Sequence, residues 1–192
     1  MKKIQKGSYG YLKSRKILTG TAMTAGYLLV LLLFFTGIFL YADRRNLLTA
    51  AAILVCLPTG KMTVNFLMYP GRGKAELNEL NELLAIAGDM PVICDLLITP
   101  EKKPVEITYA AVNKSHIIAY CTDGKLDNAY HGDFIRKFLK SCDISVDVSF
   151  YNDYGKFKKR LAALKANEPE EYSQEEKERL ENIVHNFEIL SI

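Results

Sequence analysis

The sequence predicts a two-span α-helical membrane hairpin followed by an α/β domain with a four-stranded mixed sheet. Three observations support this fold class. Two long apolar runs lie within the first 70 residues, strand-like apolar runs follow between residues 91 and 150, and helical apolar periodicity recurs around them. The soluble part should therefore have an αβββαβ core with extra C-terminal helices.

The first apolar run covers residues 22–41 and contains no charged side chain. About 20 helical residues span the roughly 30 Å hydrocarbon core of a bilayer, so we predict a transmembrane helix over 21–41. Residues 1–20 form a basic cytosolic tail before it. A cleaved signal peptide is the competing interpretation. It is disfavoured because its apolar part would exceed the usual length of about 7–15 residues, and no small-residue cleavage pattern precedes Arg44.

The second apolar run predicts a transmembrane helix over 47–69, after a short external loop over 42–46. Pro58, Gly60, Lys61 and Asn65 interrupt it. A lysine inside a bilayer costs about 2.5–3.5 kcal/mol, so Lys61 is a candidate functional residue, and Asn65 lies one turn further on the same helix face. The pair could form an intramembrane polar contact between spans or between subunits. Alternatively, Lys61 extends to the cytoplasmic headgroups.

The distribution of Lys and Arg predicts the orientation. Six precede the first span, two follow the second, and two lie in the loop between them. The positive-inside rule then places both termini in the cytoplasm, residues 70–192 as a cytosolic domain, and the chain as a multi-pass protein of a plasma membrane, such as the bacterial inner membrane.

Charge is divided between the two parts. Residues 1–70 carry nine Lys or Arg and one acid, net +8, whereas residues 71–192 carry sixteen and twenty-one, net −5. The basic part suits anionic headgroups. The acidic part makes nucleic acid an unfavourable partner. The four cysteines show no CxxC spacing, and no disulfide is expected in the cytosol.

The elements of the soluble part follow from periodicity. Leucines at helical spacing predict a helix over 74–88. Three strands over 91–99, 105–112 and 115–122 have such short connections that they must form an antiparallel meander. A helix over about 129–141 then leads to an alternating strand over 144–150, which favours parallel pairing. Two more helices follow, over about 153–166 and from Ser173, where Glu176 completes a capping box.

The hairpin ITYAAVNKSHIIAYCTD, residues 107–123, resembles the NERD-type members of the restriction-endonuclease-like fold, as does the αβββαβ order. The resemblance covers about 80 residues. It implies a metal-dependent nuclease with an aspartate on one strand and an E-x-K motif on the next. Those positions fall at Thr108, Cys121 and Asp123, so the required residue types are missing. A hydroxyl and a thiol do not replace the carboxylates that bind Mg²⁺, so nuclease activity by the family's mechanism is not expected.

Other acids could replace the missing ligands. Glu82, Asp95 and Glu106 lie on neighbouring predicted elements, and Glu101 begins an isolated E-x-K in a turn, where exposure to solvent is the simpler interpretation. His131, with Asp127 and Asp133, could be read as ligands, but surface or capping roles are favoured. We therefore predict no catalytic, cofactor-binding or metal-binding residue and no cofactor.

The sequence favours a non-catalytic, membrane-anchored interaction or regulatory domain. Its expected partners are the lipid bilayer and either another protein or further copies of this chain. One alternative is a membrane-attached, metal-dependent hydrolase or nuclease with relocated acids. The other is a subunit of a small oligomeric transporter or channel, which depends on Lys61.

Overall fold

The computed structural model describes residues 5–41, 46–69, 73–101, 103–122, 126–169 and 172–191. The chain divides into two compact units. Leu12–Arg72 form a helical hairpin, and Met1–Tyr11 together with Gly73–Ile192 form an α/β domain. The start of the chain therefore belongs to the second unit, whereas the sequence suggested a separate tail.

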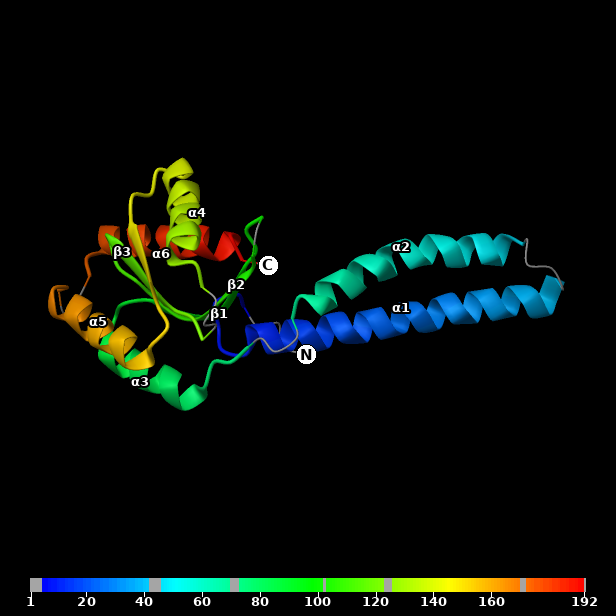
Figure 1. Ribbon diagram of the computed structural model, residues 1–192, viewed down its shortest axis with the longest axis horizontal. Helices are drawn as coiled ribbons and strands as arrows, with labels where there is room; N and C mark the ends of the chain where they lie inside the picture. The colour runs from blue at the N-terminus through cyan, green and yellow to red at the C-terminus, as the bar shows by residue number, and fades with distance from the viewer. Residues whose placement is uncertain are drawn as a thin grey trace. The chain divides into compact units, whose positions relative to one another are not determined.

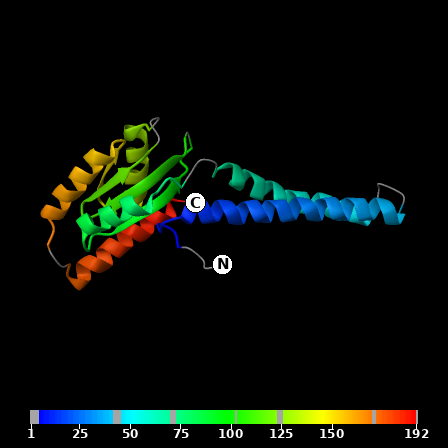
Figure 2. The same cartoon turned by 90° about the horizontal axis from the view of Figure 1, so that it is seen from below.

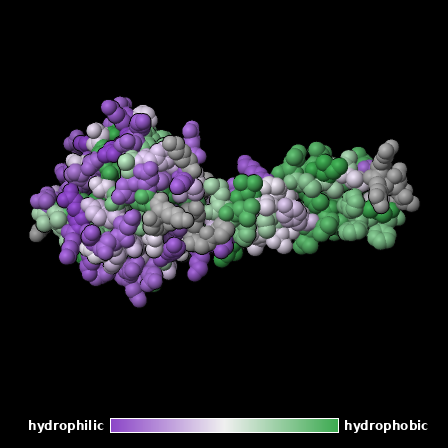
Figure 3. Space-filling view, viewed as in Figure 1, coloured by the Kyte–Doolittle hydropathy of each residue, from purple (hydrophilic) through white to green (hydrophobic). Residues whose placement is uncertain are grey.

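The hairpin consists of α1, Tyr11–Tyr41, and α2, Leu47–Leu67. Both are long and apolar enough to cross a membrane. Only 6% of the most apolar stretch of α1 and 11% of that of α2 is buried, so neither is the core helix of a water-soluble fold. Figure 3 shows the largely hydrophobic surface of the hairpin. The prediction of two long apolar helices is confirmed, although α1 begins ten residues before residue 21.

Small residues of α1 pack against α2. An added Cβ at Gly26 would lie 2.5 Å from Thr59 Oγ1, and one at Gly20 would lie 3.0 Å from the Phe66 ring. The hydroxyl groups of Tyr27 and Thr63 are 3.0 Å apart and form a hydrogen bond between the helices. Close approach at small residues and hydrogen bonds between helices are both typical of membrane-helix pairs.

The sheet of the α/β domain has the strand order β1–β2–β3–β4. Its first three strands, β1 (Val92–Ile98), β2 (Val105–Val112) and β3 (His116–Tyr120), form an antiparallel meander. α4, Asn128–Ser141, then leads to β4, Asp147–Tyr151, which pairs parallel with β3. The predicted four-stranded mixed sheet and its pairings are confirmed.

Helices cover both faces of the sheet (Figures 1 and 2). α4 and α6, Gln174–Ile189, pack on one face, and α3, Leu77–Ala87, and α5, Tyr154–Ala166, pack on the other. This two-sided cover explains why all eight residues of β2 are buried. The alternation predicted over 144–150 is also confirmed, since Val146 and Val148 are buried whereas Ser145 and Asp147 are exposed. The Ser173–Glu176 capping box is present at the start of α6.

Residues 5–10, the entry segment, lie along the outer edge of β1. Gly7 O accepts a hydrogen bond of 2.9 Å from Cys94 N, and the Lys6 ammonium donates one of 2.6 Å to Ser191 O. Ser191 in turn forms an isolated antiparallel bridge with Ile98. Both ends of the chain therefore cover the edge strand, where unpaired backbone groups would otherwise be exposed. The basic tail predicted over 1–20 includes these residues, but their contacts with β1 were not predicted.

Candidate functional site

Thr108, the position at which the resemblance expects an aspartate, lies just past the last paired residues of β2 and β3. The two strands pair from Val112–Ile117 to Tyr109–Tyr120. Past this point the hydroxyl oxygens of Thr108 and Thr122 are 2.8 Å apart. A cavity of about 400 Å³ opens there, which we call the strand-end cavity; it is lined by Lys74, Glu76, Glu79, Thr108, Tyr120 and Thr122.

Tyr120, which lines this cavity, belongs to a cluster of tyrosine rings. Tyr109 and Tyr120 stack with their centroids 6.1 Å apart, and Tyr154 meets Tyr120 edge-on at 5.7 Å. The Tyr109 hydroxyl accepts a hydrogen bond of 2.6 Å from Glu76 N and donates one of 2.9 Å to the Glu79 carboxylate. A buried tyrosine of the sheet thereby positions the first turn of α3.

Burial raises the pKa of the phenol groups of Tyr109, Tyr120 and Tyr154, and the nearby carboxylates raise it further. The three hydroxyls are therefore protonated at neutral pH and act as donors. With the carboxylates of Glu76 and Glu79 at the start of α3, the cavity offers hydrogen-bonding groups for a polar ligand. Neither of these carboxylates comes from a strand.

The structure separates the three positions implied by the family resemblance. Thr108 lines the cavity, as its correspondence with the metal-binding aspartate suggests. Cys121 does not: its side chain is fully buried in the core on the α4 and α6 face. The side chains that face the cavity here are Tyr120 at the end of β3 and Thr122 just after it, because alternate residues of an extended chain share a face. Asp123 lies outside the described residues.

The acids considered as relocated metal ligands have other partners. Glu82 is exposed, forms an ion pair with Lys158 and accepts a hydrogen bond of 3.0 Å from the Tyr154 hydroxyl. The hydrogen bond from Lys158 makes the largest contribution to lowering the pKa of Glu82, and the one from Tyr154 lowers it further. The contacts link α3 to α5.

The other two acids are buried and bind backbone N–H groups next to the hairpin unit. Asp95, only 1% exposed, accepts a hydrogen bond of 2.8 Å from Gly10 N, which precedes α1. Glu106, 7% exposed, accepts one of 2.7 Å from Gly73 N, which follows the hairpin unit. Among the described residues, no cluster of three or more His, Cys, Asp or Glu side chains is suited to a metal ion.

Asp95 also has an unusual backbone conformation. Its φ of 54° lies in the left-handed region, which asparagine and aspartate tolerate better than other non-glycine residues. Ile93 and Leu96 both pack in the core on the α4 and α6 face, so the alternation of β1 changes phase at Asp95. A charged residue within the buried run PVICDLLIT was the only sequence signal for this site.

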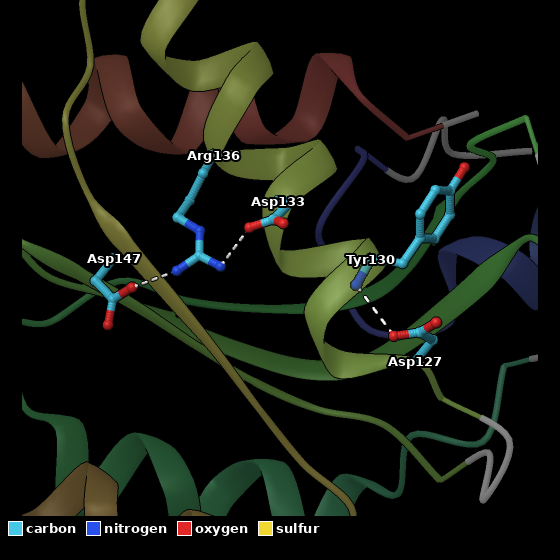
Figure 4. A network of polar contacts seen from close by, with 5 residues as sticks. All are labelled: Asp127, Tyr130, Asp133, Arg136 and Asp147. Carbon is cyan, nitrogen blue, oxygen red and sulfur yellow. Dashed lines mark hydrogen bonds and ion pairs between the residues drawn. The ribbon is translucent and has the colours of Figure 1, made fainter.

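The residues around His131 have structural roles (Figure 4). Asp127 caps α4 by accepting a hydrogen bond of 3.1 Å from Tyr130 N. Arg136 contacts Asp133 at 2.8 Å and Asp147 at 2.9 Å, which connects α4 with β4. His131 is buried, and its two ring nitrogens lie 2.8 and 3.1 Å from the backbone oxygens of Asp127 and Lys103.

Lys61 and Asn65 do not take part in the contact between α1 and α2. Thr59 and Thr63 face α1. Lys61 lies two residues after Thr59, and Asn65 lies two residues after Thr63. Two residues correspond to a turn of about 200° around a helix, so the Lys61–Asn65 face points away from α1. The side chain of Lys61 is exposed. A contact between subunits stays a prediction.

The chain was compared with models of protein families, with curated proteins and with solved structures. No match was found in any of the three.

Proposed function

We propose that this protein is a membrane-anchored interaction or regulatory domain. In this proposal α1 and α2 cross a plasma membrane as a hairpin, of the bacterial inner-membrane type, and the α/β domain and both termini lie in the cytoplasm. The exposure of two long apolar helices supports the proposal most directly. Such a surface is unstable in water and requires lipid or another apolar partner.

The hydrogen bonds of the two buried acids also support this role. Asp95 and Glu106 bind the chain immediately before and after the hairpin unit. Both acids lie on neighbouring strands of the central sheet. A displacement of the helices in the bilayer would therefore act on the sheet through two short connections, as a regulatory domain requires.

A non-catalytic role is favoured by the donor set of the strand-end cavity. β2, β3 and the residues just after β3 contribute Thr108, Tyr120 and Thr122, whose hydroxyl groups are poor ligands for a divalent cation compared with carboxylates. The relocated acids Glu82, Asp95 and Glu106 are engaged elsewhere. The contacts of these three acids therefore give the hydrolase alternative no support.

A labelling experiment tests the proposed topology. Single-cysteine variants at Ala42 and at exposed Ala162 of α5 would be treated with a membrane-impermeant maleimide in spheroplasts. We expect Ala42→Cys to react from outside, and Ala162→Cys to react only after permeabilisation. Release of the protein by alkaline carbonate, or labelling of Ala162→Cys from outside, would contradict the proposal.

The placement of Lys61 favours self-association as the form of interaction. An exposed ammonium and Asn65 on the face away from α1 are available to a second copy. If they form that contact, Lys61→Leu should shift the oligomer size of the full-length protein in detergent. An unchanged oligomer size and unchanged insertion would instead support extension of Lys61 to the headgroups.

A further inference from the structure

We propose that the hairpin binds an anionic phospholipid in a groove beside the contact between α1 and α2. This inference rests on the proposed membrane insertion and adds a specific lipid class to it. The groove has a volume of about 680 Å³ and lies wholly within the hairpin unit. Its wall is formed mainly by one side of α1 and is completed by Phe66 of α2.

Two lysines lie at one end of this groove. Lys13 and Lys16 are three residues apart on α1 and line the groove together. Neither lysine takes part in the ion pairs that Lys114, Arg136 and Lys158 form within the described residues. The two ammonium groups are therefore available to a phosphate. Basic pockets between transmembrane helices on the cytoplasmic side are typical sites for anionic headgroups.

The remainder of the groove suits an acyl chain. Ile17, Ala25 and Leu28 supply apolar surface below the lysines, and Gly20 leaves space beside the Phe66 ring. From Lys16 to Leu28 the helix rises about 18 Å at 1.5 Å per residue. This length is close to one leaflet of the hydrocarbon core, about 15 Å. The order of charged and apolar groups along the groove therefore matches that of a phospholipid.

The test compares spin-labelled phosphatidylglycerol with spin-labelled phosphatidylcholine around the full-length protein in vesicles. The spectra give the fraction of motionally restricted lipid and hence a relative association constant. Since one basic residue near the surface favours an anionic lipid by about fivefold, we expect a preference of roughly five- to thirtyfold for phosphatidylglycerol. Lys13→Gln/Lys16→Gln should reduce the preference to about onefold.

Two pairs of variants separate the groove from general effects. Lys2→Gln/Lys3→Gln removes the same charge from the start of the chain and should leave most of the preference. Ala25→Phe should fill the groove and abolish the preference with both lysines intact, whereas Ala22→Phe, on another side of α1, should not.

Equal association of the two lipids with the inserted protein would overturn the proposal. So would an unchanged preference in Lys13→Gln/Lys16→Gln, or an equal loss in Lys2→Gln/Lys3→Gln, which would indicate attraction to the surface charge alone. Disulfide-linked dimers of Ala25→Cys would assign the groove to a second copy. Resistance to carbonate extraction is measured first, so failure of insertion is distinguished from absence of a lipid site.

Discussion

The carboxyl group of Asp95 accepts a hydrogen bond of 2.8 Å from the backbone N–H of Gly10, the residue before α1. The two residues are 85 positions apart in the sequence. Asp95 has a buried carboxylate and a backbone φ of 54°, and both are unusual for an aspartate within a strand. This contact joins the central sheet to the entry segment that precedes the first apolar helix.

Loss of the Asp95 side chain should release the entry segment. We expect Asp95→Ala to destabilise the α/β domain by about 1–3 kcal/mol and to accelerate tryptic cleavage after Lys6. Asp95→Asn, which keeps a side-chain acceptor and tolerates the left-handed conformation, should have a smaller effect. Thermal unfolding and limited proteolysis of the full-length protein measure both effects.

Asp143 provides the matched control. It also has positive φ, 60°, but it is exposed. Asp143→Ala therefore has a similar backbone cost without removing a buried contact. Equal destabilisation by the two alanine variants would mean that the backbone conformation, and not the hydrogen bond to Gly10, accounts for the effect.

Gly7 should tolerate substitution much less well than Gly10. Both have positive φ, +73° and +76°, so alanine costs each about 1 kcal/mol of backbone strain. An added Cβ at Gly7 would also collide with Ile93 and Glu188, whereas nothing lies within 4 Å of one at Gly10. We expect Gly7→Ala to cost about 1–3 kcal/mol more in unfolding experiments. Similar stabilities would refute the docking of the entry segment against β1.

The side-chain directions just after β3 predict that glutamate substitutions at two neighbouring positions differ in cost. Cys121→Glu would bury an unpaired carboxylate in the core and should cost more than about 3 kcal/mol. Thr122→Glu would place it at the exposed edge of the strand-end cavity and should cost less than about 1 kcal/mol. Chemical denaturation compares them. A stable Cys121→Glu variant would instead support the correspondence of residue 121 with the family's glutamate.

Cys56 reports on the environment of α2. Its side chain is exposed in the structure, whereas Cys94 and Cys121 are buried. The pKa of Cys94 is raised to about 12, mainly by burial and to a smaller extent by the charge of Asp95. That thiol is therefore unreactive. In a Cys142→Ser background, a water-soluble maleimide should not label Cys56 in intact membranes but should label it after denaturation. Rapid labelling in intact membranes would show that α2 is in water.

The domain should lose stability in acid. Hydrogen bonds from Lys158 and Lys114 lower the pKa of Glu82 and Glu176, respectively, below the ordinary value of 4.5. A carboxyl with a depressed folded-state pKa stabilises the fold above its unfolded-state pKa, and this contribution is lost as pH falls through the folded value. Unfolding temperatures should therefore decrease below about pH 4.5.

The Glu82→Gln/Glu176→Gln variant tests this assignment, because it should reduce the pH dependence in that window. Glu188 contributes in the opposite direction, since burial raises its pKa. A pH profile identical to that of the unchanged protein would exclude the two ion pairs as its origin.

The sequence by itself determined the elements that arise from local patterns. Long apolar runs predicted the two long apolar helices, and the alternation from Ile144 to Phe150 predicted a strand with one buried face. The short turns required the antiparallel meander, and Ser173 with Glu176 marked the start of α6. These features depend on neighbours within a few residues, so periodicity and capping chemistry reveal them.

Only the tertiary structure decided the roles of the buried acids and the extent of the domain. The partners of Asp95 and Glu106 are 85 and 33 positions away, and no local pattern connects them. The positive φ and the change of phase at Asp95 were also not predictable from the alternation of the run. The sequence therefore named the acids, but only the fold showed that two of them bind the chain on either side of the hairpin, because hydrogen bonds between distant segments form only once the sheet is assembled.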